Sequence, residues 1–367
     1  MSLNHKLDRV MIAGGGTGGH LYIGIALARE LQRRNPARDF LFVGTRHGLE
    51  ARIVPQEGFR VEFIVSAGLK RVGWRESVRN LLRVPRSLAQ ARRLIRSFAP
   101  GIVVGVGGYS SGPVVLAAWW LGRPTLITEP NAYPGLTNRL LAPVVDRVAL
   151  ALPNAGGYFG KKAVVTGIPV REEFRHLPRR NRRPGEISLL IYGGSQGSRA
   201  LNALVCSSLS DLKELGCGLR LVHQTGEKAL EEVRQAYRLA GVEAEVQAFF
   251  PRIYEQFGDA DLILSRAGAG TVAEVTAAGK AAILVPFPGA ADDHQTRNAR
   301  ALEQHGAAKL IPESEWQPGR LARELRHFME HPEEITRMEE AALQLAQPEA
   351  TRRIADMIEE LAGGSRQ

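Results

Sequence analysis

Two polar clusters in the second half of the chain directly follow apolar runs of strand length. The run at 262–264 leads into the Gly-rich segment 266–274, and the run at 281–285 leads into the polar segment 292–298. In an open parallel sheet, ligands bind in the crevice beyond the carboxyl ends of the strands. Because both clusters fall at such ends, we expect them to line a single binding pocket.

Glu274, in the first cluster, admits two interpretations. Thr271 and Glu274 have the spacing of a capping box, in which the glutamate bonds back to the threonine backbone at a helix start. The alternative is a carboxylate that accepts two ribose hydroxyls, as an acid does in dinucleotide-binding folds. Because Gln295 and Asn298 stand in the second cluster, we favour the ribose interpretation.

The second cluster also contains Asp292, Asp293 and His294, which are residue types that bind metals. Adjacent residues at a helix start point in different directions, so three consecutive side chains do not readily converge on one ion. We therefore predict no metal site at these residues. We also expect no cofactor.

A Gly-rich loop also follows the first apolar run of the chain. Gly14, Gly16 and Gly19 satisfy G-x-G-x-x-G, which lets the backbone and a helix N-terminus approach a phosphate. The dinucleotide fingerprint further requires an acid near the end of the second strand, and the segment 44–46 has none. Arg46 suits a 2′-phosphate and leaves an NADP enzyme open as an alternative, whereas the G-x-x-x-x-G-K-[ST] pattern of a P-loop is missing.

His20 closes this first loop at the start of a predicted helix. The positive end of a helix dipole favours the neutral imidazole, which can accept a proton as a general base. A histidine that only caps the turn is the alternative.

A second Gly-rich loop, at 193–198, follows the apolar run 187–192. Its backbone N–H groups and the Ser195 hydroxyl suit a diphosphate. Two such loops, one in each half, predict two phosphate-bearing ligands, which a dehydrogenase with a single cofactor does not need. Together with the polar clusters, they favour a nucleotide-sugar whose sugar and ribose occupy the predicted pocket.

Strand and helix elements must position these residues. Apolar runs of strand length alternate with helical stretches along all 367 residues, which is typical of parallel sheets built from βαβ units. The pattern weakens between 164 and 183, where we place a linker, and restarts at 187. We therefore predict an α/β protein of two Rossmann-like domains that face each other across a cleft. Strands are expected at 10–13, 40–43, 61–64, 102–106, 125–128, 187–192 and 281–285, and helices at 21–34, 199–212 and 350–361.

Basic side chains are concentrated between 68 and 98, within a chain of formal net charge +10. Trp74 and several leucines are interleaved with them. This combination suits an anionic membrane surface, to which each Lys or Arg adds roughly 1 kcal/mol of attraction. A solvated helix face is the alternative, and no recognition module accompanies the charge to indicate nucleic acid.

Cys206 and Cys217 are the only cysteines, which suits a reducing cytosol. The polar N-terminus predicts no signal peptide, and the apolar region 102–127 is too interrupted by glycine and proline for a spanning helix. We expect a cytoplasmic protein that does not cross a membrane.

Several segments resemble, in order, those of one family. They are the first Gly-rich loop, 107–113, 134–139, 193–202 and 293–295. The family is the MurG type of peptidoglycan glycosyltransferase, and the resemblance covers nearly the whole chain. It implies the two-domain GT-B fold and a metal-independent, inverting reaction at the cytoplasmic face of the membrane. In that reaction N-acetylglucosamine passes from UDP-N-acetylglucosamine to the C4 hydroxyl of the muramyl sugar of lipid I, which gives lipid II.

The resemblance also implies roles for domains and residues. Residues 1–167, with 349–367 packed back on them, would bind lipid I and face the membrane, and residues 168–348 would bind the donor. The candidate bases are His20 and Glu129. The residues expected around UDP-N-acetylglucosamine are Thr17, Gly18, Gly19, Asn131, Arg171, Gly194, Ser195, Gln196, Phe250, Ala269, Gly270, Thr271, Glu274 and Gln295. Those expected at the acceptor pyrophosphate are Gly15, Gly16, Tyr109, Ser110, Ser111 and Gly112.

Three of the donor residues have distinct expected roles. Arg171 would approach the donor phosphates, Phe250 would offer its backbone to the uracil, and Gln295 would contact the sugar hydroxyls. These roles come from the resemblance alone.

Three positions depart from the family pattern. Thr128 stands where the family commonly has a histidine, Ile168 replaces a usual asparagine, and Gly270 stands where some members have leucine. The first departure leaves the general base open between His20 and Glu129. Two other classes remain as alternatives, a UDP-N-acetylglucosamine 2-epimerase and a non-enzymatic nucleotide-sugar binder.

Overall fold

The computed structural model describes residues 8–15, 18–66, 74–108, 110–178, 182–183, 185–194 and 197–364, with the backbone alone for 18, 74–82 and 291. The chain forms two compact units. Unit 1 comprises Met1–Val170 and Gln347–Gln367, and unit 2 comprises Arg171–Ala346.

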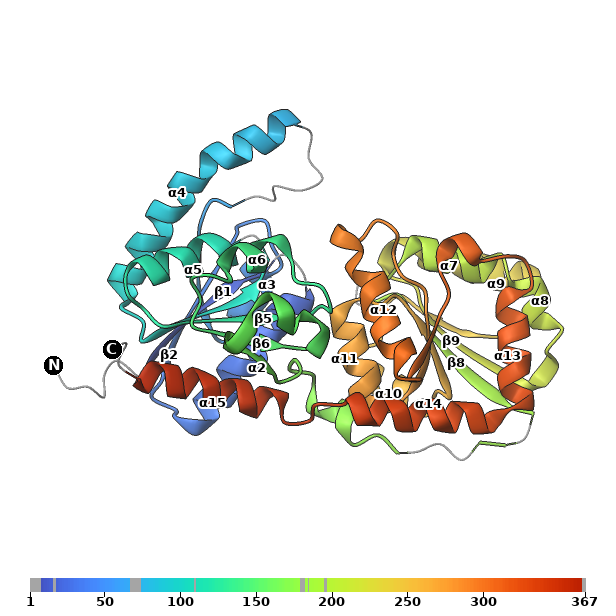
Figure 1. Ribbon diagram of the computed structural model, residues 1–367. Coiled ribbons are helices and arrows are strands. Elements are labelled where there is room, and N and C mark those ends of the chain that lie inside the picture. The colour runs from blue at the N-terminus through green and yellow to red at the C-terminus, as the bar shows by residue number, and fades with distance from the viewer. Residues whose placement is uncertain are drawn as a thin grey trace. The chain divides into compact units, whose positions relative to one another are not determined.

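Unit 1 contains a parallel sheet of seven strands in the order β3-β2-β1-β4-β5-β6-β7. Helices cover the sheet on both faces (Figure 1), so its central strands are apolar and buried on both sides. The strands are β1 (Arg9–Gly14), β2 (Asp39–Gly44), β3 (Arg60–Phe63), β4 (Ile102–Gly107), β5 (Thr125–Glu129), β6 (Arg147–Leu150) and β7 (Ala163–Val165). The helices are α2 (Gly18–Arg34), α3 (Glu50–Gln56), α4 (Trp74–Phe98), α5 (Ser111–Trp120), α6 (Leu136–Leu141) and α15 (Ala350–Gly363).

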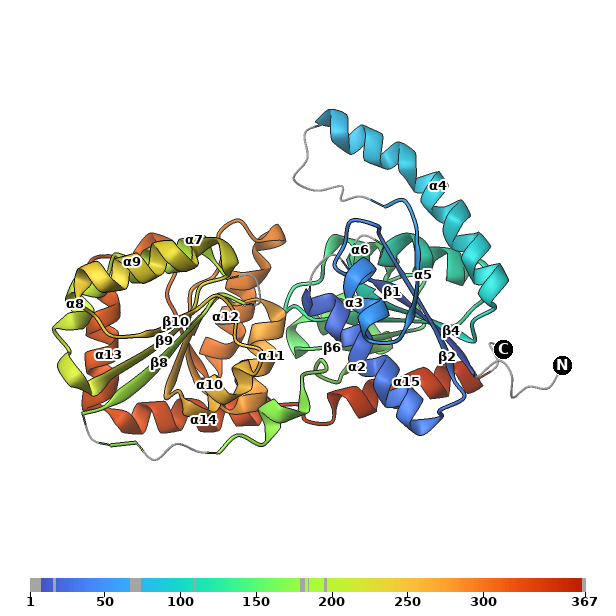
Figure 2. The same ribbon diagram turned by 180° about the vertical axis from the view of Figure 1, so that it is seen from behind.

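Unit 2 contains a parallel sheet of six strands in the order β10-β9-β8-β11-β12-β13. Helices again lie on both faces, as Figure 2 shows from behind. The strands are β8 (Ile187–Tyr192), β9 (Leu219–Gln224), β10 (Glu245–Gln247), β11 (Leu262–Ser265), β12 (Ala281–Leu284) and β13 (Ala308–Leu310). The helices are α7 (Arg199–Cys206), α8 (Leu209–Lys213), α9 (Leu230–Ala240), α10 (Ile253–Asp259), α11 (Ala269–Ala278), α12 (His294–Gln304), α13 (Arg320–Glu330) and α14 (Pro332–Leu345).

Two parallel, helix-covered sheets confirm the predicted Rossmann-like α/β class, and each predicted strand is present with its ends within one residue. The single helix predicted at 199–212 is wrong, because α7 ends at Cys206 and α8 begins at Leu209. The hydroxyls of Ser207 and Ser208 both donate to the Leu204 carbonyl, at 2.8 and 2.9 Å. These bonds compete with backbone donors for the same carbonyl, which favours a break in the helix.

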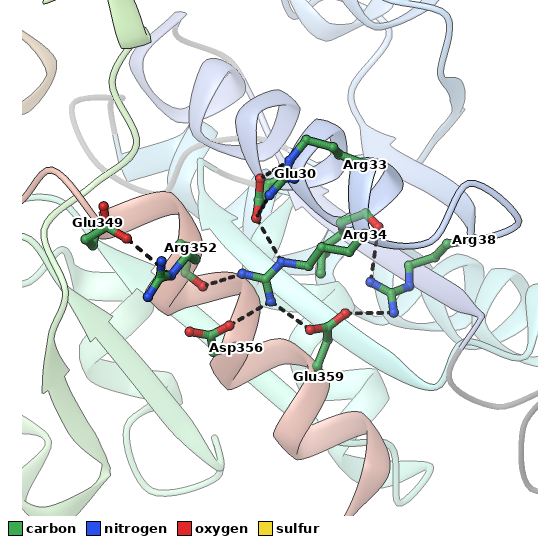
Figure 3. A network of polar contacts seen from close by, with 9 residues as sticks. Glu30, Arg33, Arg34, Arg38, Glu349, Arg352, Asp356 and Glu359 are labelled. Carbon is green, nitrogen blue, oxygen red and sulfur yellow. Dashed lines mark hydrogen bonds and ion pairs between the residues drawn. The ribbon is translucent and has the colours of Figure 1, made fainter. Parts of the chain in front are cut away.

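The last helix, α15, packs on α2 within unit 1. Arg34, at the end of α2, is the centre of this contact (Figure 3). Its Nη1 lies 2.7 Å from Asp356 Oδ1 and 2.7 Å from Glu359 Oε2, and its Nε lies 2.8 Å from Glu30 Oε1. Arg38 adds an ion pair of 3.0 Å with Glu359. A partly buried cluster of charges therefore holds the C-terminal helix on unit 1.

Candidate functional site

The two polar clusters of unit 2 lie at one edge of the sheet, because β11 and β12 are parallel neighbours. Asn298 Nδ2 donates to the Ala267 carbonyl at 3.1 Å, which ties α12 to the loop after β11. Gln295 Oε1 accepts from the Phe287 N–H at 2.9 Å, which ties α12 to the loop after β12. Asn298 is fully buried and serves the loop, whereas Gln295 is partly exposed and accessible to a ligand.

Glu274 does not form a capping box. The helix α11 begins at Ala269 without a side-chain cap, so Thr271 lies inside the helix rather than at its cap. The Glu274 carboxylate instead lies beside the hydroxyl of Tyr192, a buried residue at the end of β8. Burial raises the pKa of Glu274 to about 7, against the opposing effects of the Arg171 charge and the Tyr192 hydroxyl.

Arg171 stands close to this carboxylate at the start of unit 2. Its guanidinium lies 5.2 Å from the ring centroid of Phe174 and 5.7 Å from that of Tyr254. Its Nη1 donates to the Pro251 carbonyl at 3.4 Å. The rings and the carbonyl hold a cation beside an acid, and this pair can bind both the phosphates and the hydroxyls of one ligand.

The second Gly-rich loop joins β8 to α7. Gly194 and Gly197 have φ values of +86° and +70°, in the left-handed region that favours glycine. A Cβ at Gly197 would lie 2.0 Å from the Thr225 carbonyl oxygen, so the loop rests directly on the turn after β9. Ser198 caps α7 by accepting from the Leu201 N–H. Free N–H groups at the start of a helix, next to such a loop, suit a diphosphate.

Gln224 lies outside the motifs considered in the sequence analysis, yet it joins two of the predicted donor-binding segments. It is the last residue of β9 and is 1% exposed. Its Nε2 donates to the Gly194 carbonyl at 3.0 Å, and its Oε1 accepts from the Phe250 N–H at 2.9 Å. The one signal for it in the sequence is its place at the carboxyl end of an apolar strand.

Arg266 joins three further segments at the same edge, although it is almost fully buried. Its Nε donates to Ser198 Oγ at 2.9 Å. Its Nη1 donates to the carbonyls of Val285 and Pro286 at 3.0 and 3.1 Å, and it forms an ion pair with Glu313. The loops that surround the predicted donor pocket are thus fixed to one another by a buried cation.

In unit 1, the first Gly-rich loop packs against the loop after β4. The Gly15 N–H donates to the Gly107 carbonyl at 3.3 Å, and a Cβ at Gly108 would lie 2.3 Å from the Gly15 carbonyl oxygen. His20 lies in the first turn of α2, and a Cβ at Gly107 would come within 2.7 Å of its Cδ2. The imidazole therefore rests on glycine backbone at the carboxyl edge of the sheet.

A buried acid lies beside the end of β2, close to the place where the dinucleotide fingerprint requires one. The segment 44–46 itself contains no acidic residue. Glu50, the first residue of α3, is 1% exposed, and its Oε1 accepts from the Thr45 N–H and hydroxyl at 2.8 and 3.0 Å. A Cβ at Gly15 would lie 2.3 Å from Glu50 Oε2, so the carboxylate packs directly against the first Gly-rich loop. Glu50 therefore belongs to α3, the helix that follows β2, and not to the strand.

Glu129, one of the two candidate bases, is 1% exposed and accepts four hydrogen bonds. Its Oε1 accepts from the N–H and Nδ2 of Asn131 at 2.9 and 3.2 Å. Its Oε2 accepts from the Gly135 N–H and Asn138 Nδ2 at 3.0 and 2.8 Å. Burial raises the pKa of Glu129, and these hydrogen bonds oppose the shift. Thr128 is fully buried and its hydroxyl contacts no hydrogen-bonding group among the described residues, so it does not replace the family's histidine.

The other predicted acceptor residues lie at the start of α5. The side chains of Ser110 and Ser111 are 1% and 0% exposed, so their hydroxyls face the interior rather than a ligand. A Cβ at Gly112 would lie 2.9 Å from Thr137 Cγ2. Contact with an acceptor here would use backbone N–H groups. Of the remaining predicted residues, Gly18 and Gly19 begin α2, Gly270 lies in the first turn of α11, and Gly16, Thr17, Tyr109, Ser195 and Gln196 lie outside the described residues.

A cavity of about 820 Å³ lies between α4 and α5, and we call it the basic–aromatic groove. The Arg92 guanidinium lies 5.7 Å from the Trp120 ring centroid, and Trp120 is 69% exposed. In Figures 1 and 2, the N-terminal half of α4 projects beyond the rest of unit 1. The residues that line the groove are Pro85, Leu88, Ala89, Arg92, Arg93, Arg96, Ser97, Ala117, Trp120 and Leu121.

Within the part of the chain that the structure describes, no helix combines the length and apolar character needed to span a membrane. Across the same residues, no three His, Cys, Asp or Glu side chains converge as ligands for a metal ion.

Known proteins match this chain over both units. The description "Glycosyltransferase family 28 N-terminal domain" matches residues 10–150, and its C-terminal counterpart matches residues 188–360. A UDP-N-acetylglucosamine–N-acetylmuramyl-(pentapeptide) pyrophosphoryl-undecaprenol N-acetylglucosamine transferase from Anaeromyxobacter sp. (strain Fw109-5) is 46% identical over 358 residues, which cover 96% of this chain and 93% of that protein.

Solved structures agree with these matches. The crystal structure of Acinetobacter baumannii MurG is similar with a TM-score of 0.80 and 32% identity, over 96% of this chain and 99% of that one. S. aureus MnaA, solved with UDP, has a TM-score of 0.66 at 13% identity, over 96% of each chain. The second likeness shows the shared fold alone.

Proposed function

Because the chain belongs to the MurG family of glycosyltransferases, we propose that it transfers N-acetylglucosamine from UDP-N-acetylglucosamine to the C4 hydroxyl of the muramyl sugar of lipid I. The products are UDP and lipid II, with inversion at the anomeric carbon, and the reaction serves peptidoglycan synthesis in the cell wall. The observation that carries the proposal is the similarity over 96% of the chain to a relative named for this transfer.

Unit 2 binds the donor in this proposal. Glu274 accepts the ribose hydroxyls, Arg171 approaches the diphosphate, and the start of α7 receives the phosphates. The helix N-terminus and the loop N–H groups stabilise the negative charge that develops on UDP as the bond to the anomeric carbon breaks. The sugar lies by Gln295 and the first turn of α11, which contains Ala269, Gly270 and Thr271.

Unit 1 binds the acceptor and supplies the base. The N-termini of α2 and α5 receive the pyrophosphate of lipid I. The C4 oxygen attacks the anomeric carbon from the side opposite UDP, and its proton passes to His20. We assign the proton to His20 because each oxygen of Glu129 already accepts two hydrogen bonds within its own loop. Asn131, held by Glu129, then lies on a fixed loop from which it contacts the donor sugar.

The basic–aromatic groove forms the membrane-facing surface of unit 1. Its arginines are attracted to anionic headgroups, and the exposed Trp120 ring suits the interface between headgroups and acyl chains. Replacing Arg92 and Arg96 by glutamine should weaken binding to anionic vesicles about tenfold or more, at roughly 1 kcal/mol per charge. Equal binding by the variant, at low salt and to the same vesicles, would leave these residues as a solvated face.

An assay of the purified protein tests the proposed reaction. UDP-N-acetylglucosamine is incubated with and without a lipid I analogue, and UDP and sugar products are followed by chromatography. UDP release that requires the acceptor supports transfer. Formation of UDP-N-acetylmannosamine without acceptor would indicate the epimerase, and binding without any turnover would indicate a nucleotide-sugar binder.

A further inference from the structure

We propose that Gln224 is a positioning residue that fixes the spacing between the phosphate-binding loop and the base-contacting segment of unit 2, and thereby sets the preference for uridine diphosphate. This inference rests on the proposed function, since it takes the second Gly-rich loop and Phe250 as contacts of the donor. It adds a residue that touches neither substrate but determines how both ends of the nucleotide are held.

The geometry is that of a bridge across three neighbouring strands. β9 lies between β10 and β8 in the sheet, and Gln224 is its last residue. One end of its amide binds Gly194 in the loop after β8, and the other binds Phe250 in the segment after β10. A single side chain therefore spans the two segments that one nucleotide must contact together.

A side-chain amide suits both partners of Gln224, because it has one hydrogen-bond donor group and one acceptor. Gly194 presents a carbonyl and needs a donor, whereas Phe250 presents an N–H and needs an acceptor. Glutamate would keep the acceptor and lose the donor, and methionine would lose both. Asparagine is one methylene shorter, so it would not reach both partners at once. Since Gln224 is 1% exposed, water would not readily replace either bond.

Backbone contacts also place both segments on the end of β9, and the Gln224 side chain joins the two segments to each other. The Thr225 and Gly226 N–H groups donate to the carbonyls of Gln247 and Ala248, each at 3.0 Å, which aligns the segment before Phe250. On the other side, the Gly-rich loop rests on the Thr225 carbonyl.

The bond to Gln224 also determines what Phe250 offers a base. Its N–H is committed to Gln224 Oε1, so the polar group it can present is its carbonyl. A carbonyl accepts from N3–H of uracil, whereas N3 of cytosine carries no hydrogen and would face it as a second acceptor. The orientation of this peptide therefore favours uracil over cytosine, and Gln224 maintains that orientation.

Two variants separate the two ends of the bridge. Gln224→Glu removes the bond to Gly194 and places negative charge by the loop, while the bond to Phe250 remains. It should weaken UDP and CDP by the same factor of about ten or more, raise the KM for UDP-N-acetylglucosamine, and change kcat little. Gln224→Met removes both bonds, so it should also bring the ratio of UDP to CDP affinity close to one.

The matched control is Lys280→Met, at the opposite edge of the same sheet. Lys280 Nζ donates to the carbonyls of Gly258 and Ala260 at 3.0 and 2.8 Å, so this variant also loses two buried hydrogen bonds. It should lower the melting temperature of the protein without changing the ratio of UDP to CDP affinity. Calorimetric titration gives the affinities, and thermal unfolding shows that each variant is folded.

The outcomes are distinct. If Gln224→Met keeps the wild-type preference for UDP over CDP, or if Lys280→Met loses it equally, Gln224 has only a structural role and the inference is overturned. If the wild-type protein binds neither nucleotide, the proposed donor function itself fails.

Discussion

The pKa of Glu274 gives a quantitative prediction for donor binding. Burial raises this pKa to about 7, so close to neutral pH the free protein is a mixture of protonated and ionised forms. Ribose hydroxyls donate most strongly to an ionised carboxylate. We therefore expect UDP-N-acetylglucosamine to bind the ionised form, and binding to release a proton wherever Glu274 is still protonated. Glu274→Gln removes this titration and nearly preserves the shape of the side chain.

The magnitude follows from the pKa. With a pKa of about 7, Glu274 is protonated in about nine-tenths of molecules at pH 6 and about one-tenth at pH 8. Affinity should therefore rise about tenfold between these values, with about one-half of a proton released per ligand at pH 7. The donor suits this test because its diphosphate is esterified at both ends, whereas the terminal phosphate of UDP titrates near pH 6.

The same shift predicts a pH dependence of stability. Because the folded-state pKa lies above the ordinary glutamate value of 4.5, Glu274 does not affect the unfolding free energy below pH 4.5 and lowers it as pH rises from 4.5 to about 7. The full loss above pH 7 is roughly 3 kcal/mol, at about 1.4 kcal/mol for each tenfold change in proton affinity. Glu274→Gln should be more stable than the wild type at pH 8, by an amount that disappears at pH 4.5.

Calorimetric titration in buffers of different ionisation enthalpy measures the released protons directly, and denaturant unfolding at several pH values measures the stability. The reasoning is refuted if the wild type releases no proton between pH 6 and 8. It is equally refuted if Glu274→Gln retains the wild-type dependence of affinity on pH, since another group would then be titrating.

Other residues give further predictions. His20→Ala should lower kcat by a factor of about 100 or more while the donor KM stays unchanged in steady-state assays; full turnover would remove it as the base. Glu129→Gln should lower the unfolding free energy by about 1–3 kcal/mol, because an oxygen that accepts two N–H groups becomes a donor; unchanged stability with lost turnover would instead identify Glu129 as the base. Arg34→Met should cost about 2 kcal/mol of unfolding free energy at low salt and less at high salt, because it leaves the carboxylates on α15 without their central cation. A loss that does not depend on salt would show that packing, not charge, holds this helix.

The sequence predicted the fold closely because strands buried on both faces appear as short apolar runs, and each is separated from the next by helical spacing. Helix boundaries were harder to predict, as the break after Cys206 shows. That break depends on two serine hydroxyls that turn back to one carbonyl, and side-chain rotamers of this kind leave no periodic signal. The capping-box alternative for Thr271 and Glu274 is wrong, because the N-cap of α11 is Gly268, three residues before the position that the pattern requires.

Residues that hold the loops were beyond prediction for a related reason. Glu50 and Gln224 each act on a loop that is distant in sequence, and neither is part of a Gly-rich motif. Motif spacing shows which backbone approaches a phosphate, but it does not show which buried side chain holds that backbone in place. Only the order of strands brings Gln224 between Gly194 and Phe250.

Three glutamates near strand ends illustrate how burial separates structural from functional acids. Glu50 packs against the first Gly-rich loop and accepts two hydrogen bonds from Thr45, and Glu129 accepts four hydrogen bonds from its own loop. Among the described residues, Glu274 has fewer donors than Glu129, and burial raises its pKa to about 7. Ribose hydroxyls would supply the missing donors, so ligand binding should complete a site that folding leaves unsatisfied. An acid that gains donors on binding is suited to recognise the nucleotide, whereas proton transfer stays assigned to His20, because each oxygen of Glu129 already accepts two hydrogen bonds.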